Sequence, residues 1–348
     1  MRWKNRPEGS NWGDFGPDDQ LGRLNWLTPE KVKQAAAEIV EGLTFSLSLP
    51  LDFPGGNVLN VRRHPPVLAP TEREGMLYTN FPLARFNPGA IDVLSDDKVT
   101  MSLQYSTQWD GLGHVGALFD ADGDGHAERV YYNGFRPNKD IEGLMDYDEK
   151  NGFQESLTGL KQPNAKALDV TPLATKGMQG RGVMVDLAAH YGREAKQVGY
   201  DDLMRILEKD GVEIERGDIL VLHTEFAQCL LEMNRNPDPD VVHNLCTSLD
   251  GTDTRLHQWV TDSGIVAIAA DNYAVETHPA CLPNVCCAVL PLHHHCMFKL
   301  GIPLAELWHL TPLARWLRAN KRNRFFLTAP PLYLPGAVGS PVTPIATV

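Results

Sequence analysis

The 348-residue sequence has few cysteines, and their arrangement indicates neither a zinc ribbon nor a disulfide framework. Six are present, no two are spaced as C-x-x-C, and Cys286 and Cys287 are adjacent. We therefore expect small buried thiols in a reducing compartment, the cytoplasm. The opening residues, MRWKNRPEGSNWG, also lack the apolar core of a signal peptide.

Long apolar runs and clusters of basic residues are missing as well. No run of about 18 apolar residues occurs, so we expect no transmembrane helix. The 32 Lys and Arg residues are outnumbered by 44 Asp and Glu residues, which gives a formal net charge of −12. This balance argues against a nucleic-acid partner or an anionic membrane surface and predicts an acidic surface that aids solubility.

Several well-known active-site signatures are absent. The sequence has no G-x-S-x-G nucleophile elbow and no H-E-x-x-H zinc helix. The glycines of GMQGRG, residues 177–182, are in the wrong order for a dinucleotide-binding loop. DADGDG, residues 120–125, is similar to the start of a calcium loop, but the twelfth position is Tyr131 rather than glutamate. A hairpin tip is the better prediction there.

Hydrophobic periodicity predicts helices that alternate with buried strands in the second half of the chain. Strands that are apolar on both faces and alternate with helices indicate an α/β fold with a mixed sheet. No repeat or linker divides the sequence, so we expect a single domain over residues 1–348. The predicted elements are a helix over 200–210 ended by Gly211, a strand over 217–224, a helix over 254–263 ended by Gly264, a strand over 265–270, a helix ended by Gly301, and a strand that carries Glu306.

The first half of the chain is less regular. A helix is predicted to begin at Pro29 with Thr28 as its N-cap, to bury Ala35, Ala36, Ile39 and Val40 on one face, and to end at Gly42. Residues 54–98 are rich in Pro, Gly and Asn and predict a long excursion, of the kind that commonly covers a site. The remaining expectations are strands over 45–52 and 99–109, and a turn followed by a strand in each of 120–135 and 172–192.

Two clusters of side chains carry candidate chemistry. In SLQYSTQWDGLGHVG, residues 102–116, Gln104, Gln108, Asp110 and His114 stand at relative positions 0, 4, 6 and 10. The glycines between Asp110 and His114 disfavour a helix and let the backbone curl, so that both side chains can face one centre. The second cluster is the histidine triplet 293–295, followed by Glu306. Residue types alone leave a metal site and satisfied core histidines as open alternatives.

These residues resemble the H-x-G-T-H-x-D-x-x-x-H signature of the cyclase family of metal-dependent hydrolases, which includes kynurenine formamidases and isatin hydrolases. Aligned on Asp110, the signature places Gln104 and Gln108 where the family has histidines, Thr107 on the threonine and His114 on the last histidine. HHCMFKLGIPLAE is similar to the second metal segment of the family, and WGDFGPDDQLGRLNWLTPE to the N-terminus of its longer members. The likeness spans about residues 11–335, with an N-terminal extension over about residues 1–45.

The resemblance implies a swivelling β/β/α fold, a homodimer or higher homo-oligomer, and a divalent metal. The family pattern holds two metals in overlapping ligand groups, and the two glutamines weaken only the first group, because a carboxamide oxygen binds zinc-like ions poorly. The second group survives as Asp110, His114, His294 and Glu306. We therefore expect one ion per chain, manganese or zinc.

The resemblance also implies the chemistry: hydrolysis of an amide, cyclic amide, imide or lactone of a small substrate by metal-activated water. His293 or His295 is a candidate general base, and Gln108 a candidate donor to the developing oxyanion. We expect Gln104 to bind the substrate or metal-bound water. Trp109 faces an aromatic substrate or, as the alternative, packs in the core.

Two other functions remain open from the sequence. The same metal can stabilise an enolate in a lyase or isomerase. The glutamines can also mark a catalytically silent protein that only binds a small molecule.

Overall fold

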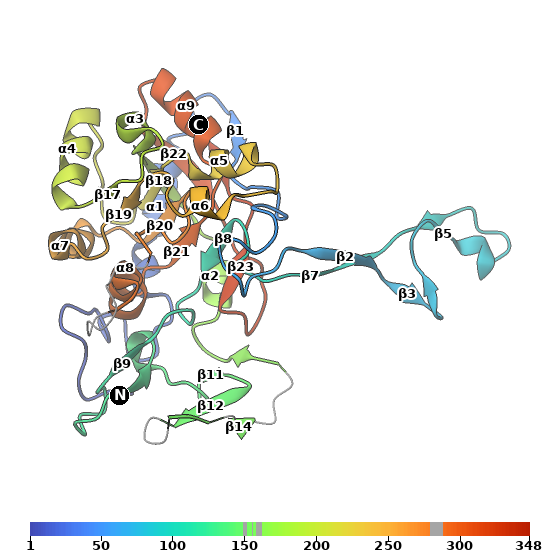
Figure 1. The fold of residues 1–348 in the computed structure, drawn as a ribbon, viewed down its shortest axis with the longest axis horizontal. Coiled ribbons are helices and arrows are strands. Elements are labelled where there is room, and N and C mark those ends of the chain that lie inside the picture. The colour runs from blue at the N-terminus through green and yellow to red at the C-terminus, as the bar shows by residue number, and fades with distance from the viewer. Residues whose placement is uncertain (149–151, 155, 158–161, 279–287) are drawn as a thin grey trace.

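The structure is a computed structural model that describes residues 1–148, 152–154, 156–157, 162–278 and 288–348. A mixed sheet of nine described strands runs through the body of the molecule (Figure 1). From edge to edge the strands are β1 (Thr44–Ser46), β24 (Ile345–Thr347), β22 (Arg324–Thr328), β16 (Gln179–Asp186), β18 (Ile219–His223), β20 (Ala267–Ala270), β21 (Leu304–Glu306), β8 (Gln108–Asp110) and β23 (Gly339–Pro341).

The four middle strands β16, β18, β20 and β21 are parallel, and the outer pairings are antiparallel. Every residue of β18 and β20 is buried, as expected for parallel strands covered on both faces. The α/β class and the mixed sheet predicted from the sequence are therefore confirmed.

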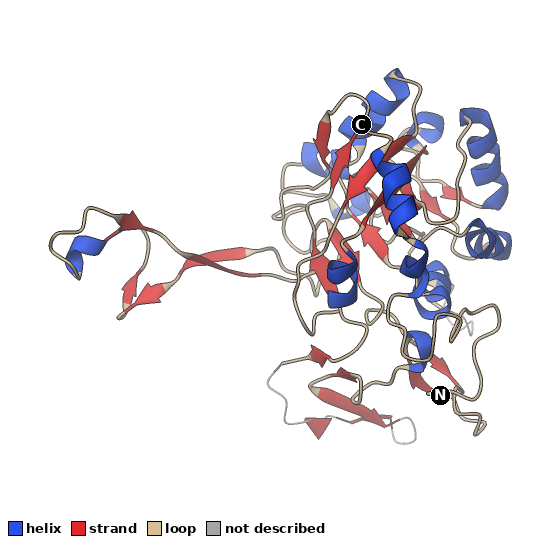
Figure 2. Cartoon of the chain, turned by 180° about the vertical axis from the view of Figure 1, so that it is seen from behind, coloured by secondary structure: helices blue, strands red, loops and turns tan. Residues whose placement is uncertain are grey.

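Helices cover both faces of the sheet (Figure 2). The helices are α1 (Pro29–Ala36), α2 (Thr171–Lys176), α3 (Ala188–Tyr191), α4 (Tyr200–Asp210), α5 (Phe226–Glu232), α6 (Pro239–Val242), α7 (Thr254–Ser263), α8 (Pro291–His293), α9 (Thr311–Ala319), the 3₁₀ turns η1 (Gly22–Trp26), η2 (Leu83–Arg85) and η3 (Tyr132–Gly134), and the π-helix η4 (His294–Lys299). On one face, Leu313 and Leu317 pack with Met184, Val221 and other buried residues of the strands. On the opposite face a second core forms from alternate strand residues and from residues of α4, α7, α8 and η4.

The predicted helix–glycine–strand units are confirmed. Gly211 and Gly264 follow α4 and α7 in the left-handed conformation that favours glycine, and Gly301 follows η4 with φ of 60°. Each is followed by the expected strand, β18, β20 or β21. This succession brings Glu306 into the middle of the sheet.

Two local predictions are wrong. The helix that begins at Pro29 ends at Ala36, and Ile39 and Val40 are exposed. The amides of Glu41 and Gly42 instead donate to the carbonyl of Val348, which draws the chain away from the helical path. The turn expected before residue 179 is instead a helix, α2, which ends at Lys176 and is capped by Gly177.

Residues 54–98 do not form a cover over the body. Most of them build an arm that projects far from the sheet (Figure 1), whereas the first residues of the segment, up to Arg63, lie against the body. The expectation of a segment over a site therefore holds only for these first residues. The strands of the arm are β2 (Val67–Pro70), β3 (Glu72–Arg73), β4 (Met76–Leu77), β5 (Phe81–Pro82), β6 (Val93–Leu94) and β7 (Asp97–Thr100). The strand expected over 99–109 is split, because β7 ends in the arm and turns precede β8.

The other described strands form small sheets outside the central one. The turn and strand expected in 120–135 are present as the hairpin of β9 (Ala117–Phe119) and β10 (Glu128–Val130). The remaining strands are β11 (Ile141–Glu142), β12 (Met145–Asp148), β13 (Gly152–Gln154), β14 (Ser156–Leu157), β15 (Asn164–Ala165), β17 (Gln197–Val198) and β19 (Ser248–Leu249). Among the described helices, none has the length and apolar character needed to cross a membrane.

Candidate functional site

Strand β8 presents two polar side chains to the face of the sheet that α8 covers. It lies between β21 and β23, and its Gln108 is the direct cross-strand neighbour of Glu306. Side chains alternate along a strand, so Gln108 and Asp110 share a face with Glu306 while Trp109 points to the other. The start of β8 is fixed by Thr107, whose hydroxyl donates to the carbonyl of Leu307 and accepts from the amide of Leu49.

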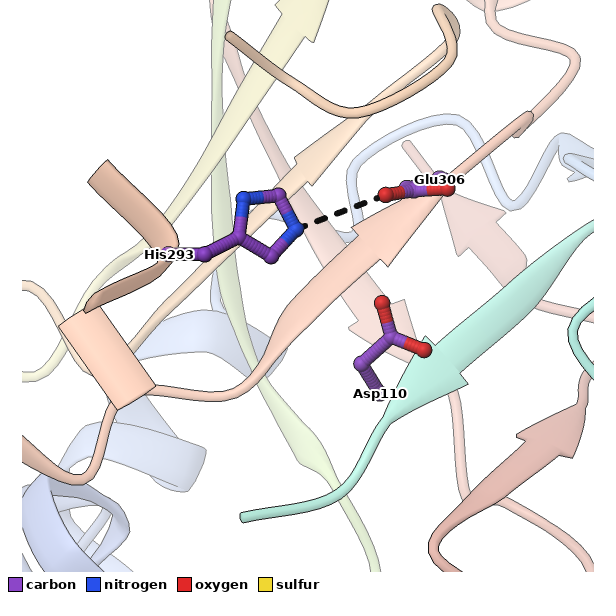
Figure 3. A group of neighbouring side chains, drawn as sticks. All are labelled: Asp110, His293 and Glu306. Atoms are coloured by element: carbon purple, nitrogen blue, oxygen red, sulfur yellow. Dashed lines mark ion pairs between the residues drawn. The ribbon is translucent and has the colours of Figure 1, made fainter. Parts of the chain in front are cut away.

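His293 completes the group from the last turn of α8 (Figure 3). The ligand atoms of Asp110, His293 and Glu306 all lie within 4.8 Å of one another, and all three residues are buried. Nδ1 of His293 lies 2.8 Å from Oε1 of Glu276, and its Nε2 lies 3.5 Å from Oε1 of Glu306. A histidine that is held by a carboxylate at one ring nitrogen and directs the other nitrogen at further candidate ligands has the arrangement typical of a metal-binding histidine.

His114 turns back toward Asp110 as the glycines predicted. Its Nε2 lies 3.9 Å from Oδ1 of Asp110, and its backbone amide donates to the carbonyl of Gly111. Gly113 passes so close to Leu168 that an added Cβ would lie 2.9 Å from the Leu168 carbonyl oxygen. The loop therefore needs glycine where it curls.

Burial and neighbouring charges shift the pKa values of all three residues of the group. Burial raises the pKa of Asp110, although His114 opposes the rise. Burial also acts to raise the pKa of Glu306, but its hydrogen bond with His293 and the charge of Arg63 lower it overall. For His293, burial is outweighed by Glu276 and Glu306, which raise its pKa to about 10.

The donor set fits a divalent ion. Two buried carboxylates and an imidazole nitrogen converge, and this oxygen and nitrogen set suits zinc or manganese. Gln108 gives a second, independent indication of a bound ion, because its Oε1 is buried with no hydrogen-bond partner among the described residues. Its Nε2 lies 3.2 Å from Asp110 Oδ1 and 3.3 Å from Glu306 Oε2, so the carboxamide sits against the carboxylates.

Arg63 brings a positive charge to the site from the base of the arm. Its Nη1 donates to the carbonyl of Gln104 at 2.8 Å and lies 3.8 Å from Oε2 of Glu306. The guanidinium lies 5.8 Å from the ring centre of Tyr273, whose hydroxyl accepts a hydrogen bond from Asn60. These three side chains line a small cavity of about 10 Å³, large enough for about one water molecule.

A larger groove of about 790 Å³ opens on the other side of Tyr273. Its lining includes Glu276, which holds His293, and His278, whose ring lies edge-on to Tyr273 at 6.5 Å. A groove that reaches the support of His293 is a route by which a small molecule can approach the site.

The structure does not bring all the predicted site residues together. His293, expected to be a base, occupies the place expected for His294. The ring of His294 lies against Phe298 at 4.9 Å, and burial lowers its pKa to about 4. His295 stacks on His257 at 4.7 Å and lies 2.9 Å from the hydroxyl of Thr261, so it faces α7. Its pKa is lowered to about 3 by burial.

The two predicted substrate-binding residues lie on different faces of the sheet. Trp109 is fully buried in the core, where its Nε1 donates to the carbonyl of Ala329 and its ring meets Trp308 edge-on at 5.3 Å. Trp109 therefore packs in the core, which was the alternative to its contacting an aromatic substrate. The side chain of Gln104 lies over Gly339, the cross-strand neighbour of Asp110, and an added Cβ on Gly339 would meet its Nε2 at 2.2 Å.

Sequence reasoning missed Glu276 and Arg63. Glu276 is fully buried, and its two oxygens also accept the backbone amides of Leu292 and His293. No motif marks a glutamate in AVETH as a partner of a histidine 17 residues later. Arg63 lies in an irregular segment, where the adjacent pair Arg62–Arg63 before two prolines was the only available signal.

The remaining motifs are accounted for outside this site. DADGDG forms the tip of the β9–β10 hairpin, where Asp120, Asp122 and Asp124 cap backbone amides of the turn. Cys229, Cys246 and Cys296 are free and buried, as expected. Cys281, Cys286 and Cys287 lie outside the described residues.

Comparisons with known proteins agree with the fold. The model of the family described as "Putative cyclase" matches residues 45–277. A crystal structure of a novel cyclase is 32% identical, with coverage of 97% of each chain and a TM-score of 0.73. No curated protein matches the sequence.

More distant structures share the fold. Isatin hydrolase A from Labrenzia aggregata, bound to benzyl benzoate, is 13% identical over 91% of this chain and 98% of its own, with a TM-score of 0.54. Isatin hydrolase A from Ralstonia solanacearum is 14% identical over 92% of this chain and 97% of its own, also with a TM-score of 0.54. With the family match covering most of the sequence, this chain belongs to the cyclase family.

Proposed function

We propose that this chain is a metal-dependent hydrolase that cleaves an amide, cyclic amide, imide or lactone bond of a small substrate. The observation that carries the proposal is the buried group of Asp110, His293 and Glu306, whose ligand atoms lie within 4.8 Å of one another. Support comes from the fold, which the chain shares with isatin hydrolases.

One divalent ion, manganese or zinc, is held by Asp110, Glu306 and Nε2 of His293, with His114 beside Asp110 completing the set. His293 takes the place that the sequence assigned to His294, because Glu276 holds its Nδ1 and turns its Nε2 toward the carboxylates. When bound, such an ion polarises a carbonyl and lowers the pKa of water.

The surrounding side chains position the substrate. Arg63 presents guanidinium N–H groups beside Glu306, where they bind the carbonyl oxygen of the substrate or the carboxylate that hydrolysis releases. The ring of Tyr273 provides an apolar wall on which a planar or aromatic substrate stacks. Gln108 stays at the carboxylates and offers its carboxamide to hydrogen bonding within the site.

The adjacent histidines 293 and 294 provide a matched test. We expect dialysed wild-type protein to contain about one manganese or zinc per chain by elemental mass spectrometry, because one ligand set is intact. His293→Ala should lose the metal. His294→Ala should keep it, because its ring packs on Phe298. Metal retained by His293→Ala and lost by His294→Ala would contradict the ligand set.

A panel of amides, imides and lactones tests the reaction itself. The carboxylate product, followed by liquid chromatography and mass spectrometry, should accumulate with the wild-type protein and be absent in His293→Ala. Ligand-induced thermal stabilisation without hydrolysis of any member of the panel would overturn the hydrolase and favour a binding protein.

A further inference from the structure

The helix that carries the histidine triplet, residues 291–300, changes its geometry along its length. It begins as α8 and continues as the π-helix η4 from His294 to Lys299. A π-helix bonds residue i to i+5 where an α-helix bonds i to i+4, so this stretch takes up an extra residue. Such turns are rare and occur mostly at functional sites. Contacts outside the helix must therefore favour the wider form.

The start of this helix is held by Glu276. The Glu276 carboxylate accepts the amides of Leu292 and His293 and also holds Nδ1 of the His293 ring. A rotation of the first turn would break all of these contacts. The start is therefore fixed in the orientation in which His293 meets the carboxylates of the candidate metal site.

The end of the helix is held by the N-terminal segment, residues 11–23. The last carbonyls of a helix lack partners within it, and here four consecutive carbonyls accept hydrogen bonds from this segment. The bonds run from Nε1 of Trp12 to Phe298 at 2.8 Å, from the amide of Asn11 to Lys299 at 3.1 Å, from Nδ2 of Asn11 to Leu300 at 2.8 Å, and from the amide of Arg23 to Gly301 at 3.0 Å.

The contact between this segment and the helix end is also close-packed. Gly22, with φ of 55°, lies so near Gly301 that an added Cβ would be 2.2 Å from the Gly301 carbonyl oxygen. The buried guanidinium of Arg23 donates to the carbonyls of Val260 and Thr261 on α7, both at 2.7 Å. The helix end therefore has little freedom to slide or turn.

We propose that residues 11–23 position His293 for the metal centre of the proposed function, on which this inference rests. With both ends fixed, the helix contains an extra residue, and the π-helix takes it up. With its end released, the helix would return to α-helical spacing by a turn of about 100° at its start. That turn carries His293 away from the carboxylates and brings the neighbouring His294 toward them.

Two tryptophans of one core provide a matched pair of variants. Trp12→Phe keeps a ring in the core but removes the N–H that holds the Phe298 carbonyl. Trp3→Phe is the control, because Trp3 packs in the same cluster and donates no hydrogen bond to the helix among the described residues. Deletion of Lys299, a half-buried residue of the π-helix, removes the extra residue, so that an α-helix can span the same two ends.

The affinity for Co²⁺, measured by chelator competition on folded protein, is the first readout. We expect Trp12→Phe to bind Co²⁺ at least about tenfold more weakly than the wild-type protein, as is usual when the support of a metal ligand is lost. Trp3→Phe should bind Co²⁺ as the wild-type protein does. Deletion of Lys299 from Trp12→Phe should restore the affinity, because the α-helix needs no restraint at its end. A deletion would not reverse a loss of stability alone.

The Nδ1 proton of His293 provides a second readout that needs no metal. Held by Glu276, this proton should give a slowly exchanging imidazole signal by NMR, identified by its absence from His293→Ala. The signal should persist in Trp3→Phe, disappear in Trp12→Phe and return when Lys299 is also deleted.

Wild-type Co²⁺ affinity in Trp12→Phe, an unchanged imidazole signal in that variant, or no recovery on deletion of Lys299 would each overturn the inference. A wild-type protein that binds no Co²⁺ would instead contradict the metal centre of the proposed function. The imidazole signal would then still decide whether residues 11–23 position His293.

Discussion

Nδ1 of His293 lies 2.8 Å from Oε1 of Glu276, and this contact selects which histidine of the triplet reaches the candidate metal ligands. The same glutamate oxygen accepts the His293 backbone amide, and its second oxygen accepts that of Leu292, so Glu276 fixes both the first turn of α8 and the ring. Gly251 leaves the space for it, because an added Cβ there would meet Glu276 Oε2 at 1.8 Å. A residue outside the ligand set therefore determines the geometry of that set.

Replacing this support should weaken metal binding without removing a ligand. We expect Glu276→Gln to lower the affinity for manganese or zinc by about 10-fold to 100-fold, because the carboxamide holds the Nδ1 proton less strongly and orients the ring less well. Competition with a chelator measures the affinity. Glu213→Gln, at a mostly exposed carboxylate, is the control and should bind metal as the wild-type protein does. Equal affinity in both variants would contradict the role of Glu276.

Trp109 should affect stability rather than substrate binding. We expect Trp109→Phe to lower the free energy of unfolding by about 2–4 kcal/mol, through an under-filled core and an unpaired Ala329 carbonyl. Chemical denaturation measures this loss. Trp316→Phe, at a partly buried position in the same core, should cost less. A variant of normal stability whose KM rises for a substrate found in the hydrolysis panel would show instead that Trp109 contacts the substrate.

A buried histidine at the end of β18 should make stability depend on pH. Burial lowers the pKa of His223, but its hydrogen bond with Asp186 and the charge of Asp271 raise the pKa overall. The pKa of Asp186 is lowered, since His223 and Arg318 outweigh its burial. The contribution of His223 to the free energy of unfolding is therefore complete below about pH 6.5 and is lost as pH rises through its folded-state pKa. The contribution of Asp186 to the free energy of unfolding is lost as pH falls below about 4.

The pH dependence can be measured on metal-free protein by thermal unfolding. Between pH 6 and 9 we expect the Tm of the wild-type protein to fall more steeply than that of His223→Gln, which lacks the titrating group. The variant should be less stable by about 1–3 kcal/mol at pH 6, where the pair is fully formed. His126→Gln, on the exposed hairpin tip, is the control and should follow the wild-type slope. Parallel slopes for the wild-type protein and His223→Gln would exclude His223 as the source.

Elements with a strong local signal could be predicted from the sequence. The apolar stripe of α4 and the glycine that ends it specify a helix before any tertiary contact forms, and the same is true of α7. The helix from Pro29 was predicted correctly at its start, where Thr28 caps it, and wrongly at its end. That end depends on Val348, more than 300 residues away in the sequence, which no local pattern contains.

Local sequence patterns were sufficient to predict the α/β class, the helix–glycine–strand units, and the presence of Asp110, His114 and Glu306 in elements that can meet. Which histidine joins them depends on contacts between distant parts of the chain. Consecutive residues on a helix point about 100° apart, so one of three adjacent histidines faces the carboxylates, and the position of Glu276 selects His293. The role of Arg63 and the open β7 edge could not be predicted for the same reason. Long-range packing, rather than local sequence, determines that Arg63 meets Glu306 and that β7 lacks a second partner among the described strands.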